Sequence, residues 1–187
     1  MLYQIISLLL DVVIGLLGGS CLLRLYMQHQ RVPFGNPLGR FVFAVTDWLV
    51  LPLRRVLPAL GRWDTASLVG AWLLELLQAV LLWLLAGGGG SVVLLPLVAV
   101  FGVVRLAISA LTVLVIVSAV LSWVQASQQG RSSLTADILD RLAAPLLRPF
   151  RRILPMVGGV DLSPLALLLV LQVAGIVLAA VQASVLR

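Results

Sequence analysis

The sequence predicts an all-α membrane protein whose four transmembrane helices form two parallel helix-loop-helix repeats, each with a short cytoplasmic amphipathic helix and a proline-bracketed Arg-Arg elbow. Composition is the first observation: 61% of the 187 residues are hydrophobic, 11% are charged, and the mean hydropathy is +1.15. Soluble domains have roughly 45 to 50% apolar and about 25% charged residues. The second observation is a set of four long apolar stretches, and the third is an internal repeat.

Four apolar stretches are long enough to cross a membrane. A helix needs about 20 predominantly apolar residues to span roughly 30 Å of hydrocarbon. The stretches that meet this length are 2–27, 65–86, 92–124 and 163–186. The first has no basic start and carries Asp11 within its apolar run, which favours a retained span over a cleaved signal peptide.

Two copies of one motif lie 97 positions apart. Residues 52–58 read PLRRVLP and residues 149–155 read PFRRILP, and a glycine and an aspartate follow each copy in the same register. We therefore divide the chain into a first repeat (1–86), a glycine-rich outward connector (87–91) and a second repeat (92–187). Because each repeat contains two spans, the copies run parallel and place both motifs on one face of the membrane.

The loop of the first repeat is expected to contain a short helix. Asn36 is a suitable N-cap, and Pro37 follows at the first helical position. Pro52 is expected to end the helix at about Leu51. One face of this helix is apolar and consists of Phe41, Val45 and Trp48.

The second loop repeats this pattern. Ser133 occupies the position of Asn36, Ile138 and Leu142 repeat the apolar face, and Pro145 is expected to stop the helix earlier. Both helices have two interpretations that amphipathicity cannot separate: they lie along the cytoplasmic leaflet, or they pack on the transmembrane bundle.

The arginines predict the orientation. All thirteen basic residues are arginine, and ten of them lie in the loops 29–64 and 126–162. An excess of arginine marks the cytoplasmic side, so we expect both long loops inside and both termini outside. The net charge of +6 is expected to contact anionic lipid headgroups. Nucleic acid is a poor alternative partner, because these arginines flank membrane helices and form no free basic domain.

The repeated motif supplies the first group of candidate site residues. Its prolines restrict the backbone, so each arginine pair is expected in an elbow held near the membrane surface. In one interpretation these arginines anchor the topology of the protein by binding lipid headgroups. In the other, more specific interpretation they form a docking surface for an acidic partner. The following aspartates could cap the next spans or pair with the arginines. The candidates for lipid or partner binding are Arg54, Arg55, Arg151, Arg152, Asp64 and Asp161.

Three ionisable residues lie well inside the spans and form the second group: Asp11, Glu75 and Arg105. A charge at the centre of a membrane helix costs about 2.5 to 3.5 kcal/mol on insertion scales, so each needs a partner. Counting along the helices predicts that Asp11 pairs with Arg105 and that Glu75 is protonated or faces a polar interior. Gln28 and Gln125, at matching span ends, are expected to frame a polar entrance or to lie at the interface.

Enzymatic chemistry finds little support in the sequence. There is no nucleotide-binding glycine loop, no metal-ligand spacing and no nucleophile near a histidine. His29 is the single histidine and Cys21 the single cysteine, which excludes an internal disulfide or a bis-histidine haem within one chain. We expect no catalytic residues, no metal and no cofactor.

The two motifs, each with its following glycine and aspartate, together with Asn36-Pro37 and the Asp-Leu-Ser-Pro sequence at 161–164, resemble the YggT/YlmG family, in its two-repeat bacterial form. The first repeat departs mildly, with Thr-Ala-Ser after Asp64. The resemblance implies a multi-pass protein of the bacterial cytoplasmic (inner) membrane. It links the chain to envelope or osmotic stress, ion homeostasis and cell division, and a plastid branch to haem attachment during cytochrome b6 maturation. It implies no catalytic residue.

Two functions from different classes follow. The preferred one is a non-enzymatic adaptor or assembly factor, whose doubled cytoplasmic surface binds membrane-protein partners. The alternative is a channel or transporter for ions or small osmolytes along Asp11, Glu75 and Arg105. Four spans are few for a monomeric pore, so this alternative calls for a homo-oligomer.

Overall fold

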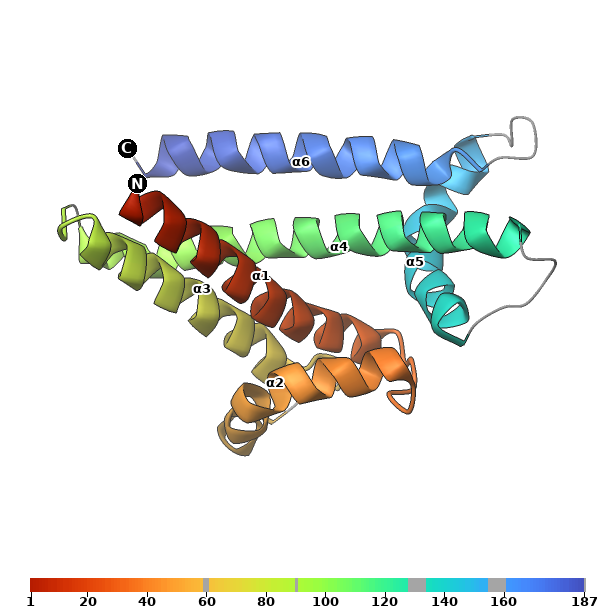
Figure 1. Ribbon diagram of the computed structural model, residues 1–187, viewed down its shortest axis with the longest axis horizontal. Coiled ribbons are helices and arrows are strands. Elements are labelled where there is room, and N and C mark those ends of the chain that lie inside the picture. The colour runs from red at the N-terminus through yellow and green to blue at the C-terminus, as the bar shows by residue number, and fades with distance from the viewer. Residues whose placement is uncertain (59–60, 90, 128–133, 155–160, 187) are drawn as a thin grey trace.

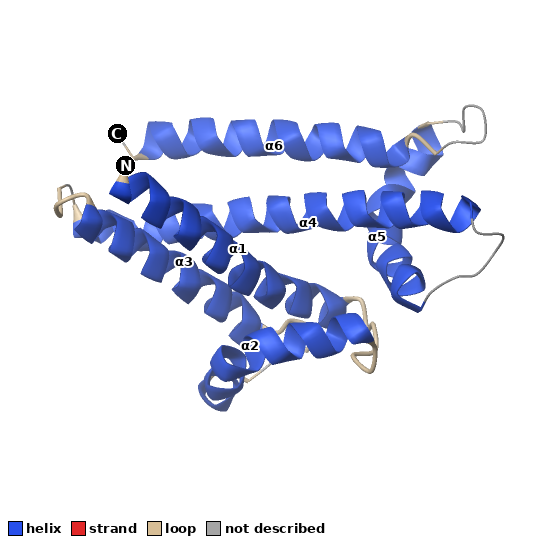
Figure 2. Cartoon of the chain, in the orientation of Figure 1, coloured by secondary structure: helices blue, strands red, loops and turns tan. Residues whose placement is uncertain are grey.

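A computed structural model describes residues 1–58, 61–89, 91–127, 134–154 and 161–186. Its elements are α1 (Leu2–His29), α2 (Pro37–Val56), α3 (Thr65–Leu85), the short 3-10 helix η1 (Val92–Leu94), α4 (Leu95–Ser127), α5 (Leu134–Ile153) and α6 (Ser163–Val185). Four segments are long and apolar enough to cross a membrane: Leu2–His29, Thr65–Leu85, Val92–Val124 and Ser163–Val185. These ranges contain no strand, and the predicted all-α architecture with four spans is confirmed (Figure 2).

The four long helices lie side by side, with the two chain termini at one end of the bundle (Figure 1). We call this the terminal end, and we call the opposite end, where α2 and α5 lie, the loop end. In space, α1 packs on α3, α3 on α4, and α4 on α6. The helices α1 and α3 slope across the line of α4 and α6 in this view.

Packing between the long helices uses small side chains where backbones approach. A Cβ atom at Gly18 of α1 would lie 2.7 Å from Leu106 Cδ1 of α4, so a larger residue there would have to displace the end of the Leu106 side chain. A buried cluster between α1, α2 and α3 contains Ile14, Cys21, Val50, Ala66, Ala71 and Leu74. By contrast, many apolar side chains of α1 and α6 are exposed, as a surface that meets hydrocarbon should be.

Helix α2 begins as the sequence predicts. Asn36 is its N-cap and accepts a hydrogen bond of 2.8 Å from Gly39 N, with Pro37 at the first helical position. Its end differs from the prediction, because the helix continues through Pro52 to Val56. Proline removes a single intrahelical hydrogen bond, and packing of the same helix against α1 and α3 outweighs this loss.

The bundle-facing side of α2 carries Val42, Thr46 and Val50, all of which are buried. Phe41 and Trp48 of the predicted apolar face point elsewhere and are 48% and 60% exposed. The helix therefore has two apolar faces. One packs on the bundle, and the other is free to meet the membrane interface, where tryptophan is enriched.

Helix α5 also continues through its prolines. It contains both Pro145 and Pro149 and ends at Ile153, so the predicted stop at Pro145 is wrong. As in α2, a buried face holds the helix in place, here through Leu139, Leu142 and Leu147. The Arg-Arg pairs consequently lie in the last turns of α2 and α5 and not in separate elbows. Ser133, the expected N-cap of α5, lies outside the described residues.

Candidate functional sites

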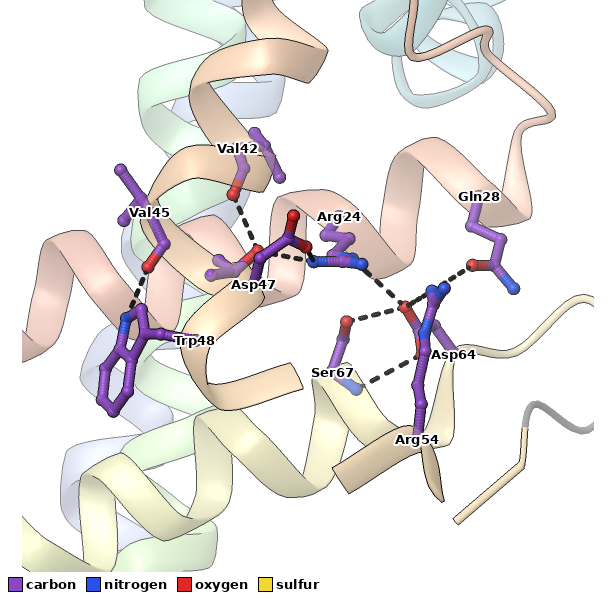
Figure 3. A network of polar contacts seen from close by, with 10 residues as sticks. Arg24, Gln28, Val42, Val45, Asp47, Trp48, Arg54, Asp64 and Ser67 are labelled. Atoms are coloured by element: carbon purple, nitrogen blue, oxygen red, sulfur yellow. Dashed lines mark hydrogen bonds and ion pairs between the residues drawn. The ribbon is translucent and has the colours of Figure 1, made fainter. Parts of the chain in front are cut away.

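A buried arginine joins three helices at the loop end. Arg24 of α1 is 2% exposed, and its Nη1 donates to Thr46 Oγ1 at 2.9 Å and to Asp47 Oδ1 at 2.6 Å, both on α2 (Figure 3). Its Nε lies 3.7 Å from Asp64 Oδ2, at the start of α3. The guanidinium also lies over the Phe43 ring, 4.6 Å from the centroid. Arg24 is therefore desolvated and compensated by two carboxylates.

Asp64 is the centre of this network and is fully buried. As the N-cap of α3 it accepts hydrogen bonds from Ser67 N and, at 2.7 Å, from Ser67 Oγ. Arg54 Nη2 donates to it at 2.5 Å and also donates to Gln28 Oε1 at 3.0 Å. Burial acts to raise the pKa of Asp64, but the hydrogen bonds from Arg54 and Ser67 and the charge of Arg54 outweigh it, so the pKa lies below its ordinary value.

The second half of the chain carries a related but simpler contact. Arg151 Nε donates to Asp161 Oδ2 at 2.8 Å, and Asp161 Oδ1 accepts from Ser163 N at 2.9 Å. Both residues lie 97 positions after Arg54 and Asp64. Burial acts to raise the pKa of Asp161, but the Ser163 and Arg151 hydrogen bonds outweigh it and lower the pKa. Here the side chains are 52% and 28% exposed, so the pair is far better solvated than its counterpart.

Inside the membrane the charges pair differently from the prediction. Asp11 accepts a hydrogen bond of 2.5 Å from Gln78 Nε2, and Arg105 Nη2 lies 3.7 Å from Glu75 Oε2. The expected pair of Asp11 with Arg105 is not formed. The predicted pairing takes the loop end of α4 as the membrane surface, but this helix has 33 residues and is about 50 Å long, so its end extends past the hydrocarbon and does not mark depth.

Gly102 explains why Glu75 reaches Arg105. A Cβ atom at Gly102 would collide with the Glu75 carboxylate, so the absence of a side chain there admits Glu75 between α3 and α4. A cavity of about 130 Å³ adjoins this contact. Its lining comes from α3, α4 and α6 and consists of Glu75, Gln78, Ala79, Leu82, Val98, Gly102, Arg105 and Gln182.

Comparison with known proteins places the chain in a family. The sequence profile described as CCB3/YggT matches residues 1–85 and 97–182. The chain belongs to the CCB3/YggT family. Among its relatives is the "Uncharacterized protein YggT" of Escherichia coli (strain K12), 40% identical over 172 residues that cover 90% of this chain and 86% of the relative.

Further relatives in the YggT family come from other bacteria. A protein of Vibrio alginolyticus, described by its place in the proC 3′ region, is 36% identical over 156 residues, 82% of each chain. A protein of Haemophilus influenzae is 30% identical over 165 residues, 88% of this chain and 86% of the relative. No solved structure matches this chain.

The remaining candidates of this YggT-family chain are distributed as follows. Gln28 contacts Arg54 and so belongs to the loop-end network. Arg55 and Arg152 are exposed at the ends of α2 and α5. Gln125 lies in α4, and its side chain falls outside the part of the chain that the structure describes. Among the four arginines of the two motifs, the first of each pair contacts an aspartate ten positions later, and the second is exposed.

Arg24 is the functional residue that the sequence reasoning missed. It lies in the last part of an apolar span, where an arginine usually marks only the boundary of the span. The available signal was a comparison of the halves: the positions 97 residues after Arg24, Thr46 and Asp47 hold Leu121, Ala143 and Ala144. Loss of all three polar groups together indicates that they form one unit.

Proposed function

We propose that this YggT-family protein is a non-enzymatic adaptor or assembly factor that organises membrane-protein complexes in the bacterial inner membrane. One observation carries the proposal: the described loop end holds ten arginines but only five aspartates, an excess of five positive charges. Asp47, Asp64 and Asp161 are occupied by arginines inside the fold. The arginines left at the surface are Arg31, Arg40, Arg55, Arg62, Arg141, Arg148 and Arg152.

The orientation of the protein follows from the same excess. Arginine-rich loops are retained in the cytoplasm, so the loop end is the cytoplasmic face and both termini lie outside. The basic surface then meets anionic lipid headgroups and the acidic segments of neighbouring membrane proteins. Planar guanidinium groups bind carboxylates in a two-pronged geometry, which favours an acidic partner segment over a nonspecific charge.

Two features support a partner-binding role for this surface. Arg55 and Arg152 occupy the same register in the two halves and are both exposed, so each half offers a guanidinium group to a partner at the matching position. The outward face of α2 adds exposed apolar side chains, and Trp48 points away from Arg24 and the buried network (Figure 3). The resemblance to the YggT/YlmG family suggests envelope stress, division or cofactor-protein maturation as the setting.

Charge reversal at Arg55 and Arg152 tests the proposal. These arginines make no described contact that holds the fold, so Arg55→Glu with Arg152→Glu should leave insertion and topology intact. Crosslinking in native membranes should recover the partner set of the wild type at least tenfold less well, because each reversal turns attraction into repulsion.

The matched control is the pair Arg55→Lys with Arg152→Lys, which keeps the charge and should retain most of the partners. Recovery of the same partner set after charge reversal would contradict the adaptor proposal. The remaining motif arginines, Arg54 and Arg151, are unsuitable for this test because their carboxylate contacts hold helices together.

Transport is the second candidate, favoured by the charged cavity at Glu75 and Arg105. It ranks lower because the buried apolar residues Ile14, Ala71 and Leu74 lie between this level and the loop-end network. A channel would therefore need several copies or a second conformation. Ion flux in proteoliposomes that disappears with Glu75→Gln would favour transport over the adaptor role.

A further inference from the structure

The cavity between α3, α4 and α6 runs from the terminal end toward the middle of the membrane. Leu82, Val98 and Gln182 each lie three residues from the terminal-end limit of their helix. Glu75 and Arg105 each lie ten residues from it, which is about 15 Å along a helix. One side of the cavity is thus at the membrane surface, and the other is near the membrane centre.

The lining of this cavity suits water. With about 130 Å³, it has room for several water molecules, and four polar side chains line it: Glu75, Gln78, Arg105 and Gln182. Arg105 is 60% exposed. A guanidinium at this depth is too costly to leave in hydrocarbon, so its surroundings must be polar.

The charges at the inner end of the cavity do not balance. The lining carries the carboxyl of Glu75 on α3 and the guanidinium of Arg105 on α4, and α6 contributes the neutral Gln182. The carboxyl of Asp11 on α1 lies behind the lining residue Gln78, to which it is hydrogen-bonded. The charge of Asp11 acts on Glu75. Two ionised carboxylates beside one guanidinium leave one uncompensated negative charge within the membrane.

Glu75 has the weaker set of partners. Its side chain is 6% exposed, and within the described residues its carboxylate has the 3.7 Å contact with Arg105 and accepts no hydrogen bond. Asp11, by contrast, accepts a short hydrogen bond from Gln78. One added proton would neutralise the excess charge, whereas a metal cation would have to sit beside Arg105 and be repelled by it.

On the loop-end side of Glu75, apolar side chains fill the contact between α1 and α3. Ala71, one turn from Glu75, and Leu74, directly before it, are buried, and on α1 the buried Ile14 follows Asp11 by three residues. A proton can therefore reach Glu75 through the cavity from the terminal end, and this apolar layer lies between Glu75 and the Arg24 network.

We propose that this cavity is an aqueous pocket open at the terminal end, and that Glu75 on its lining and Asp11, which is hydrogen-bonded to the lining residue Gln78, together bind one exchangeable proton. The proton comes from water in the pocket and returns to it, and no other bond changes. Arg105 remains charged beside Glu75, and Asp11 keeps its hydrogen bond from Gln78. This inference is independent of the proposed adaptor function.

The first experiment tests whether the pocket holds water. In a Cys21→Ala background, a single cysteine is placed at Val98, which lines the cavity, or at Leu97, which is nearer the surface but does not line it. A charged, membrane-impermeant thiol reagent is added to one side of sealed vesicles at a time. Val98→Cys should react from the terminal side at least tenfold faster than Leu97→Cys, and equal rates would overturn the aqueous pocket.

The second experiment detects the proton by infrared spectroscopy of the protein in lipid bilayers. The wild type should show the carbonyl stretch of a protonated carboxyl at neutral pH, and this band should disappear at alkaline pH. Either Glu75→Gln or Asp11→Asn should abolish it, since one carboxylate and one guanidinium then remain and their charges balance. Asp140→Asn, outside the membrane spans, should leave it unchanged.

Three outcomes would overturn the proton site. These are the absence of the band in the wild type at neutral pH, its persistence in both single variants, and its loss on addition of potassium or sodium at constant pH, which would show a metal cation in the place of the proton. Unfolding curves of the variants in detergent distinguish loss of the proton from loss of the fold, and two separate variants keep the test informative if one is unstable.

Discussion

Arg24 and Arg105 are both arginines within membrane-spanning helices, but their surroundings give them different roles. Arg24 is 2% exposed and has hydrogen-bonded or close carboxylates on two other helices. Arg105 is 60% exposed and has one carboxylate at 3.7 Å. A buried guanidinium paired with two carboxylates holds a structure together, whereas a loosely paired one beside a cavity is free to respond to what enters it.

Removal of Arg24 should be strongly destabilising. Arg24→Leu, which copies Leu121 at the matching position of the second half, leaves Asp47 and the buried Asp64 without their shared partner. Breaking a buried pair costs about 3 kcal/mol or more. The free energy of unfolding, measured by reversible denaturation in detergent micelles, should fall by roughly that amount.

The matched control is Arg151→Leu, which removes the exposed partner of Asp161. Exposed ion pairs contribute about 1 kcal/mol or less. If the two substitutions lowered the free energy of unfolding equally, the loop-end network would not be the stabilising unit that its burial indicates.

The free energy of unfolding should depend on pH in a way that reflects the ionisation of Asp64. Because its pKa in the folded state lies below the ordinary 3.8, the unfolded chain binds this proton more readily. The stabilisation is complete above about pH 5 and is lost as the pH falls through the folded pKa, below 3.8. Asp64→Asn should therefore lose less stability than the wild type on acidification through this window.

Asp140 provides a control, because its contribution to stability changes with pH in the opposite direction. Burial raises its pKa, Arg151 opposes this and Asp137 adds to it, so the folded chain binds this proton more tightly. Its contribution is present at low pH and is lost as the pH rises through the folded pKa. Asp140→Asn should make the stability of the protein rise more steeply with pH, and an unchanged slope in both variants would contradict these assignments.

At the scale of elements, the two loop helices share a plan but differ in how they are fastened. Helix α2 contributes Thr46, Asp47 and Arg54 to the buried network that joins α1 and α3. Helix α5 is held by its apolar face, by the exposed Arg151–Asp161 pair and by a hydrogen bond of 2.8 Å from Tyr26 Oη to Leu142 O. The second loop helix therefore has fewer buried polar contacts.

Amide hydrogen exchange should reveal this difference. In lipid nanodiscs, the middle of α5 should exchange at least several-fold faster than the middle of α2, because local opening of α5 breaks fewer buried contacts. Mass spectrometry of peptides from both helices measures it. In Arg24→Leu the two rates should converge, and faster exchange in α2 of the wild type would contradict the argument.

The loop helices also show that tertiary packing can keep a proline inside a helix. Pro52 and Pro145 are predicted to limit helices and Pro149 to begin an elbow, but all three lie inside helices. The local rule describes the loss of one hydrogen bond and a steric clash. It could not include the apolar face that holds each helix to the bundle on both sides of its proline.

At the scale of the whole molecule, the first half of the chain is more closely packed than the second half. The first half packs α1, α2 and α3 around a buried apolar cluster and a buried polar network. In the second half, α6 contacts chiefly α4 and α5 and exposes many apolar side chains. The cavity lies where the halves meet, since α3 belongs to the first half and α4 and α6 to the second.

The sequence by itself determined the features that depend on composition and on neighbours in the chain. Four spans follow from apolar length and the Asn36 cap from a local rule. The contacts of Arg54 with Asp64 and of Arg151 with Asp161 connect residues only ten positions apart and are one of the two roles that the sequence allows these aspartates. Only the tertiary structure decided which distant charges meet. The rotation and tilt of each helix are set by packing against its neighbours, and these angles turn Arg24 toward Asp47 and turn Arg105 toward Glu75 and away from Asp11.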